Sequence, residues 1–183
     1  MVTRAFPPPS RDTGAAPIIL TAMMGAADQR FFDALRAAHY RPDRNVLPAH
    51  ITLFHALPPS VLEELERLIG RLAAEPPPAA TLAGVYSLGG GTAFRIDSPS
   101  LLALRDRIAD HFHGSLTAQD QGTPRLHVTV QNKVTAGEAR ALLADLARDF
   151  RPRPIRIAGL AAHHYRGGPW EPAFTRNFRG ART

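Results

Sequence analysis

Two short segments of the chain place a histidine and a threonine at the same spacing. The segment HITL begins at His50 and the segment HVTV begins at His127, so threonines follow two residues later, at Thr52 and Thr129. Side chains alternate between the two faces of a β-strand, which puts each histidine on the same face as its threonine. The intervening residues are apolar. Each segment is therefore predicted to be a strand with one buried face and one polar face.

The residue types on the two polar faces suit chemistry on a phosphate group. One imidazole can remove a proton from an attacking nucleophile while the other protonates the leaving oxygen, because histidine titrates near neutral pH. Threonine hydroxyls can donate hydrogen bonds to the nonbridging oxygens as negative charge builds up. Such a site needs no cofactor and no metal. A single histidine in a strand is more often structural, so the interpretation depends on both segments facing one cleft.

Polar residues next to the second segment are candidates for binding the substrate. A regular strand would carry Arg125, Gln131 and Lys133 on the same face as His127 and Thr129. Lys133 is the only lysine of the chain and could contact a phosphate. Its alternative role is a solvated strand end, and Arg125 could instead lie in the preceding loop.

The run HHYRGGPWEP near the C-terminus supplies aromatic side chains beside cations. Tyr165 and Trp170 are candidates for stacking on a base or a ribose, as aromatic residues do in proteins that bind single-stranded nucleic acids. The alternative is an ordinary hairpin with Trp170 in the core. Both residues are retained as predicted substrate-binding residues.

The remaining histidines and the absence of cysteine limit other kinds of site. His55 is expected to face away from His50 by strand alternation and to be structural. His111 and His113 lie at the predicted end of a helix, where a cation complements the helix dipole, and no third metal ligand is evident. The chain has no cysteine, which excludes a disulfide, a thiolate zinc site and a cysteine nucleophile. No metal site is predicted.

Strands and helices that could position the two segments recur in the same order in both halves. The first half is expected to contain strands at 17–24, 50–57 and 76–90 and helices at 26–40 and 58–75. The second is expected to contain strands at 91–98, 125–134 and 151–168 and helices at 98–114 and 135–150. Predicted N-caps are Ser60 with Glu63, Ser98 or Ser100, and Thr135 with Glu138. The run SLGGGTAF is read as a hairpin turn.

This order predicts an α/β (α+β) fold in which two βαβαβ lobes form a pseudo-twofold repeat. Each lobe would have a mainly antiparallel sheet flanked by helices, with a central cleft between the lobes. Residues 1–16 are expected to form a flexible arm, and 17–183 a single domain whose lobes are residues 17–90 and 91–178. At 183 residues the chain suits one such domain.

Composition points to a globular protein with an anionic partner. The 22 basic and 16 acidic residues give a net charge of +6, which suits RNA or a phosphorylated small molecule. Because nearly all the basic residues are arginine, a compositional bias explains this excess as easily. No segment resembles a signal peptide or a membrane span, so a cytoplasmic protein without membrane contact is expected, as a monomer.

The paired segments resemble the H-x-T-x signatures, x being hydrophobic, of the 2H phosphoesterase superfamily. Within it the chain is most similar to the bacterial 2'-5' RNA ligase or RNA 2',3'-cyclic phosphodiesterase group. The resemblance implies a bilobal fold and metal-independent opening of 2',3'-cyclic phosphates, on RNA ends or small cyclic nucleotides. It also implies His50 and His127 as the acid and base pair and Thr52 and Thr129 as phosphate ligands.

Three functions remain open. The first is hydrolysis of 2',3'-cyclic phosphates, in which a first guess has His50 protonate the leaving ribose oxygen and His127 activate water; these two roles could be exchanged. Reversible, ATP-independent 2'-5' RNA ligation is the second activity, since joining is the reverse of cleavage at a 2'-5' linkage. The third is an RNA-binding module without turnover, which would not require paired imidazoles.

Overall fold

A computed structural model of the chain describes residues 16–180, so nearly all of the expected flexible arm at residues 1–16 lies outside the described residues. The secondary structure follows the predicted order with one further strand at the C-terminal end. Its elements are β1 (Ile18–Met24), α1 (Ala26–His39), β2 (Ile51–Leu57), α2 (Leu62–Leu72), β3 (Ala79–Ser87), β4 (Gly91–Asp97), α3 (Pro99–His111), β5 (His127–Asn132), α4 (Ala136–Arg148), β6 (Arg153–His164) and β7 (Glu171–Asn177).

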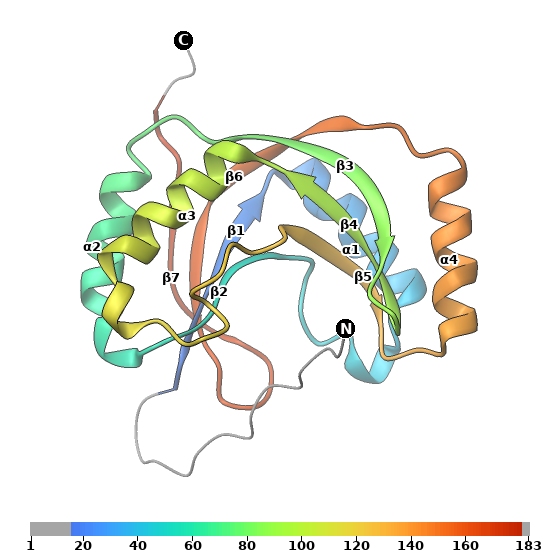
Figure 1. Cartoon of the computed structure of the whole chain (residues 1–183), viewed down its shortest axis with the longest axis horizontal. Helices are drawn as coiled ribbons and strands as arrows, with labels where there is room; N and C mark the ends of the chain where they lie inside the picture. The colour runs from blue at the N-terminus through green and yellow to red at the C-terminus, as the bar shows by residue number, and fades with distance from the viewer. Residues whose placement is uncertain (1–15, 181–183) are drawn as a thin grey trace.

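The strands form one antiparallel sheet in the order β2-β1-β6-β3-β4-β5, with β7 beside β6. The two strands that carry the H-x-T-x segments, β2 and β5, are therefore at opposite ends of the pairing order. They nevertheless approach each other in space, because the sheet curves strongly (Figure 1). The curvature brings both segments to the middle of the molecule.

The predicted α/β fold is confirmed, and the two halves of the sequence exchange strands within it. The third strand of the first half, β3, pairs with β4 of the second half. The third strand of the second half, β6, pairs with β1 of the first. The two sides of the sheet are thus β2-β1-β6-β7 and β3-β4-β5, which differ from the sequence ranges 17–90 and 91–178. Long-range hydrogen bonding decides this exchange, and local sequence does not encode it.

Helices also cross between the halves. Helix α1 follows β1 in sequence but packs against β5, and α4 covers β3 and β4. Phe32 of α1 is fully buried and meets Phe94 of β4 edge to face, with ring centres 5.4 Å apart. On the other side, the guanidinium of Arg105 in α3 lies over the ring of Phe54 in β2. Each motif strand is therefore supported by a helix from the other half.

Two of the three predicted helix N-caps are present in the structure. The hydroxyl of Ser98 accepts a hydrogen bond from the backbone of Leu101, and Thr135 forms a complete capping box with Glu138. The predicted cap at Ser60 is wrong, because residues 59–61 form a 3-10 turn and α2 begins only at Leu62. Within residues 16–180, no helix has the length and apolar character needed to cross a membrane.

Candidate active site

His50 and His127 occupy equivalent places at the starts of two strands that approach each other without pairing. His50 is the residue before β2, and His127 is the first residue of β5. Both side chains are half-buried. Nδ1 of His50 lies 2.8 Å from the carbonyl oxygen of Pro48, and Nδ1 of His127 lies 2.7 Å from that of Arg125. Each imidazole is thus anchored to the carbonyl two residues before it.

These two hydrogen bonds determine which ring nitrogen carries the proton. A carbonyl oxygen can only accept, so Nδ1 must donate in both histidines. In the neutral imidazole, Nε2 then has a free lone pair and can act as a base. After it takes up a proton, the same atom can act as an acid. Both segments therefore present Nε2 as the atom available for proton transfer.

Burial and neighbouring basic groups disfavour the protonated form of both imidazoles. Burial lowers the pKa of His50 to about 4, helped by the charges of Arg36, His127 and His163 and opposed by the hydrogen bond to Pro48. Burial likewise lowers the pKa of His127, with smaller contributions from the charges of His55 and Arg125. Because the charge of His127 acts on His50, the two imidazoles lie within electrostatic reach of one another.

The threonines follow the predicted alternation. Thr52 and Thr129 are half-buried, whereas the apolar residues on either side of each are buried. Thr52 pairs with Thr21 of β1, and Thr129 pairs with Ala93 of β4. Each hydroxyl is on the same strand face as the histidine two residues earlier. The four predicted catalytic side chains thus lie on the partly accessible faces of two strands that approach one another.

Trp170 connects the C-terminal region to this site. Its ring centre lies 4.6 Å from that of His50 and 5.4 Å from that of His163 in β6. Nε2 of His163 lies 3.4 Å from the hydroxyl of Thr21. These contacts place Trp170 beside His50, and its role in substrate binding stays a prediction. Tyr165 follows β6 directly, and its backbone amide donates to the carbonyl of Pro17.

The family model of the 2'-5' RNA ligase superfamily matches residues 25–169, which include both H-x-T-x segments. The chain belongs to this superfamily. The predicted resemblance to the 2H phosphoesterase superfamily is confirmed.

Solved structures share the superfamily fold at low sequence identity. The protein TT0787 of Thermus thermophilus is 16% identical with a TM-score of 0.62, over 91% of this chain and 100% of that one. E. coli LigT complexed with 3'-AMP is 15% identical with a TM-score of 0.59, over 90% and 99%. A structure described as a phosphoesterase is 16% identical with a TM-score of 0.53, over 90% and 99%. The chain has no significant match among curated proteins.

A β-bulge in each H-x-T-x segment changes the side-chain alternation beyond the threonine. In β5, Thr129 pairs with Ala93 and Gln131 pairs with Thr92, so Val130 is an extra residue. In β2, Thr52 pairs with Thr21 and Phe54 with Leu20, so Leu53 is the extra residue. The fourth position of both superfamily motifs is thus a bulge, and residues after it lie on the opposite face from that expected of a regular strand.

The bulges and the end of β5 at Asn132 correct three predictions. Gln131 is buried, and its amide oxygen accepts from the hydroxyl of Thr92, so it faces away from Thr129 and does not line the site. Lys133 lies beyond the end of β5, exposed and with a φ of 59°, so it is not on the strand face of His127. His55 lies on the same face as Thr52, and its charge acts on His127. His55 also contacts Asp120, whose carboxylate lies 3.2 Å from Nδ1, in agreement with the structural role expected of it.

Two further residues beside the histidines were not predicted. The ring of Tyr86 in β3 meets His127 edge to face at 6.1 Å, and the guanidinium of Arg125 lies 5.3 Å from the centre of that ring. Arg125 lies in the loop before β5, which was the alternative prediction for it, and it is close to His127 in the chain. Arg36 of α1 is buried and donates to the carbonyl of Thr129. A buried arginine is recognisable only from tertiary structure, so no sequence signal marked it.

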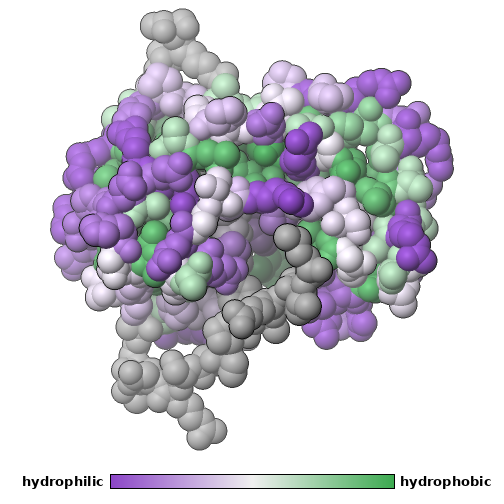
Figure 2. Space-filling view, in the orientation of Figure 1, coloured by the Kyte–Doolittle hydropathy of each residue, from purple (hydrophilic) through white to green (hydrophobic). Residues whose placement is uncertain are grey.

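The other histidines and the titratable groups of residues 16–180 form no cluster suited to a metal ion. His111 Nε2 lies 2.7 Å from Glu64, and His113 Nδ1 lies 3.1 Å from the carbonyl of Asp110. The contact of His113 agrees with its predicted place at a helix end, whereas His111 in the last turn of α3 contacts a side chain of α2. In Figure 2, hydrophilic residues dominate the helices at the edges of this view, and hydrophobic residues show along the sheet between them.

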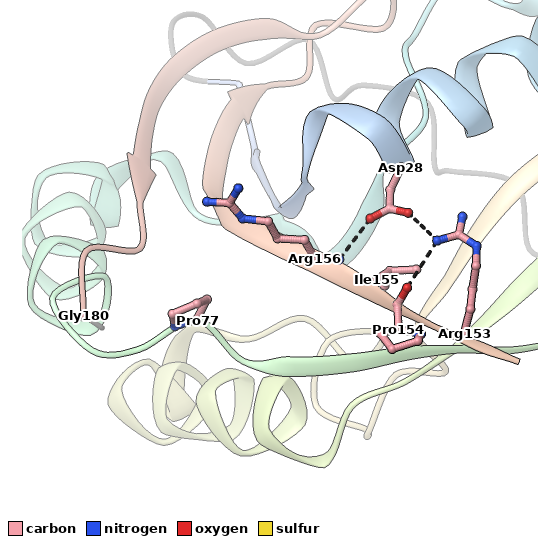
Figure 3. Close-up of a pocket in the computed structure, with 7 residues that line it drawn as sticks. All are labelled: Asp28, Pro77, Arg153, Pro154, Ile155, Arg156 and Gly180. Atoms are coloured by element: carbon pink, nitrogen blue, oxygen red, sulfur yellow. Dashed lines mark hydrogen bonds and ion pairs between the residues drawn. The ribbon is translucent and has the colours of Figure 1, made fainter. Parts of the chain in front are cut away.

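A separate pocket lies at the other end of β6 from His163. It is lined by Asp28, Pro77, Arg153, Pro154, Ile155, Arg156 and Gly180. Asp28 accepts from the guanidinium of Arg153 and from the backbone amide of Arg156 (Figure 3). The charges of Asp28 and Arg153 therefore neutralise each other, and that of Arg156 is not paired with Asp28 through its side chain. This pocket shares no residue with the superfamily motifs.

Proposed function

We propose that the protein is a metal-independent phosphoesterase that opens 2',3'-cyclic phosphates on RNA ends or small nucleotides. The observation that carries this proposal is the matched anchoring of His50 and His127. Each imidazole has its Nδ1 bound to the carbonyl two residues earlier, which leaves Nε2 for proton transfer. Membership of the superfamily supports the reaction class, and a complex of E. coli LigT with 3'-AMP supports a nucleotide ligand.

In the proposed reaction, one imidazole removes a proton from water as the water oxygen attacks phosphorus. The bond from phosphorus to one ribose oxygen breaks, and the other imidazole donates its proton to that oxygen. The hydroxyls of Thr52 and Thr129 donate to the nonbridging oxygens as their charge rises. Proton uptake and proton release balance, so the pair exchanges protonation states in each turnover.

The decisive experiment measures hydrolysis of nucleoside 2',3'-cyclic monophosphates and of RNA with a cyclic phosphate end, in the presence of a chelator. The wild-type protein is expected to be active. His50→Ala and His127→Ala should each lose activity on the order of a hundredfold to ten-thousandfold, the range for a general acid or base. His113→Ala is the matched control, because His113 is exposed and binds only a helix carbonyl. Full activity in either site variant would refute the two-histidine reaction.

The superfamily description favours a second candidate, ligation of RNA through 2'-5' linkages. The same groups can open the cyclic phosphate with a 5'-hydroxyl in place of water as the nucleophile: one imidazole removes the hydroxyl proton, the 5'-oxygen bonds to phosphorus, and the ribose 3'-oxygen leaves with the proton of the other imidazole. Fragments that end in a 2',3'-cyclic phosphate and a 5'-hydroxyl should then give a joined product without ATP. A binding module without turnover would instead show salt-sensitive RNA binding and no product from any cyclic phosphate.

A further inference from the structure

The side of the cleft that carries His127 also carries an exposed arginine. Arg95 of β4 pairs directly with His127 of β5 in the antiparallel register. Residues that face each other in such a pair have their side chains on the same face of the sheet, with Cβ atoms about 4.5–5.5 Å apart. Ala93, two residues before Arg95, pairs with Thr129 in the same way. Arg95 therefore projects from the sheet face that holds the second motif.

The guanidinium of Arg95 lies over β3, where the sheet has space for it. The residue of β3 that pairs with Arg95 is Gly84, and a Cβ at that position would lie 3.9 Å from Nε and Nη2 of the arginine. Nη2 is also 3.4 Å from the carbonyl oxygen of Ala83. Neighbouring strands lie about 4.8 Å apart, so this cation is on the order of 5–10 Å from the strand of His127.

Tyr86 and Arg125 extend the positive surface next to His127. Tyr86 of β3 is two residues after Gly84 and pairs with Ala93, so its side chain is on the same face. Its ring contacts His127 edge to face, and the guanidinium of Arg125 lies 5.3 Å from the centre of that ring. Arg125 is exposed, and neither it nor Arg95 forms an ion pair with a carboxylate of residues 16–180. Two cations that are not neutralised therefore lie beside His127.

The side of the cleft that carries His50 has a different character. Trp170 and His163 are the ring neighbours there, and burial lowers the pKa of His163, so that imidazole is uncharged at neutral pH. Arg166, in the same connection as Trp170, forms an ion pair with Glu171 at 2.9 Å. An aromatic ring on one side and cations on the other match a nucleotide with its base on one side and a further phosphate on the other.

We propose that Arg95, Arg125 and Tyr86 form a second phosphate subsite, which binds the 5'-phosphate group of the nucleotide whose 2',3'-cyclic phosphate lies at the two motif histidines. This inference rests on the proposed function and specifies its substrate. The preferred substrate carries two phosphate groups, either as an RNA end or as a small 5'-phosphorylated nucleotide. Guanidinium groups suit this task because their planar donors match the oxygens of a phosphate, and the Tyr86 ring holds Arg125 next to His127.

Ligand binding without turnover tests the subsite first. Trp170 is the only tryptophan of the chain and lies beside His50, so its fluorescence should report binding. The ligands are adenosine 2'-monophosphate and adenosine 2',5'-bisphosphate, which model an opened product without and with a 5'-phosphate. The wild type should bind the bisphosphate about tenfold or more tightly, the gain expected from charge-assisted hydrogen bonds to one phosphate. Equal affinity for the two ligands would overturn the proposal.

Removing the charge of Arg95 should remove most of this advantage. Arg95→Gln should bind the monophosphate as the wild type does and the bisphosphate several-fold more weakly, and Arg95→Lys should retain part of the gain. Arg140→Gln is the matched control, because Arg140 is exposed on α4 and the substitution removes the same charge elsewhere. An advantage that survives in Arg95→Gln, or that falls equally in Arg140→Gln, would overturn the proposal.

A charge introduced beside Arg95 gives an independent test that leaves the arginine in place. Gly84→Asp puts a carboxylate next to the guanidinium and should remove most of the advantage, because the new anion pairs with Arg95 and repels the phosphate. Gly84→Ala adds only a methyl group at an ordinary contact distance and should retain the advantage. If Gly84→Asp binds the bisphosphate as tightly as Gly84→Ala does, the second phosphate does not bind at Arg95.

Turnover identifies the source of the second phosphate and separates this inference from the proposed function. The substrates are adenosine 2',3'-cyclic phosphate, its 5'-phosphorylated form, and a diadenosine RNA dinucleotide with a 2',3'-cyclic phosphate end. The two substrates with a second phosphate should have the higher kcat/KM, mainly through a lower KM. A larger gain for the dinucleotide identifies an RNA end as the source, and a larger gain for the monoester identifies a small nucleotide.

Two outcomes of these measurements differ in what they refute. Equal kcat/KM for all three substrates would overturn the subsite and leave the proposed function standing. Absence of turnover on all three, with the bisphosphate still preferred in binding and the preference lost in Arg95→Gln, would refute the proposed function and leave the subsite standing.

Discussion

The indole ring of Trp170 lies 4.6 Å from the imidazole of His50, with the two ring planes inclined by 52°. Trp170 comes from the connection between β6 and β7, and His50 from the start of β2. The indole also contacts His163, so it is held between two imidazoles from different elements. A half-buried aromatic ring beside a candidate catalytic histidine is well placed to bind a base next to the reacting phosphate.

Replacing Trp170 should weaken binding of substrates that carry a base. Stacking on an aromatic ring is worth about 1–3 kcal/mol per base, so Trp170→Ala should raise KM for a nucleoside 2',3'-cyclic phosphate by roughly tenfold or more. Trp170→Phe should retain much of the affinity. Ribose 2',3'-cyclic phosphate without a base is the control substrate, and its KM should hardly change. An equal rise for both substrates would indicate a general loss of site structure.

The two threonines should affect the chemical step more than substrate binding. Thr52→Val and Thr129→Val keep the side-chain shape and remove one hydrogen-bond donor each. A single oxyanion donor of this kind contributes on the order of a hundredfold to a thousandfold to kcat. Steady-state kinetics on a cyclic phosphate should therefore show a fall in kcat with a smaller change in KM. Thr135→Val, at the cap of α4, is a surface control expected to keep the wild-type rate.

The pH optimum should lie on the acidic side of the ordinary histidine pKa. The base must be neutral and the acid protonated, so kcat/KM rises as pH passes the lower pKa and falls as pH passes the upper one. Burial lowers the pKa of His50 to about 4 and also lowers that of His127 below 6.5. The profile of kcat/KM for the wild type should therefore decline above pH 6.5. A plateau that extends well into the alkaline range would contradict these histidine environments.

Asp120 should stabilise the strand that carries His50. Its side chain is buried and accepts hydrogen bonds from the backbone amides of His55 and Ala56. Burial alone would raise its pKa, but the hydrogen bonds and the charge of His55 bring it below the ordinary value of 3.8. Asp120→Ala should lower the free energy of unfolding at neutral pH by about 2–3 kcal/mol, measured by urea denaturation, because two buried amides lose their acceptor.

The same carboxylate gives a pH dependence with a defined sign. Because the folded pKa is lower than the unfolded one, the ionised group stabilises the fold above pH 3.8. That contribution disappears as pH falls through the folded pKa. The stability difference between the wild type and Asp120→Ala should therefore shrink below about pH 3.8. A constant difference down to about pH 2 would show that ionisation of Asp120 is not involved.

Local patterns in the sequence determined the strands, the helices and the four central residues of the candidate site. The alternation of HITL and HVTV placed His50 with Thr52 and His127 with Thr129, since a period of two residues is a property of any extended strand. The caps at Ser98 and Thr135 are equally local, because a hydroxyl reaches a backbone amide three residues away. These features need no knowledge of distant contacts.

Tertiary pairing decided the remaining features of the site. Strand partners impose the bulges at Leu53 and Val130, and these turn Gln131 away from the motif face and His55 toward it. Exchange of β3 and β6 between the halves brings Tyr86 beside His127. The crossing of α1 places Arg36 against Thr129, 93 residues away in sequence. Each of these contacts depends on hydrogen bonds and burial between segments far apart in the chain. Local residue patterns therefore do not predict them.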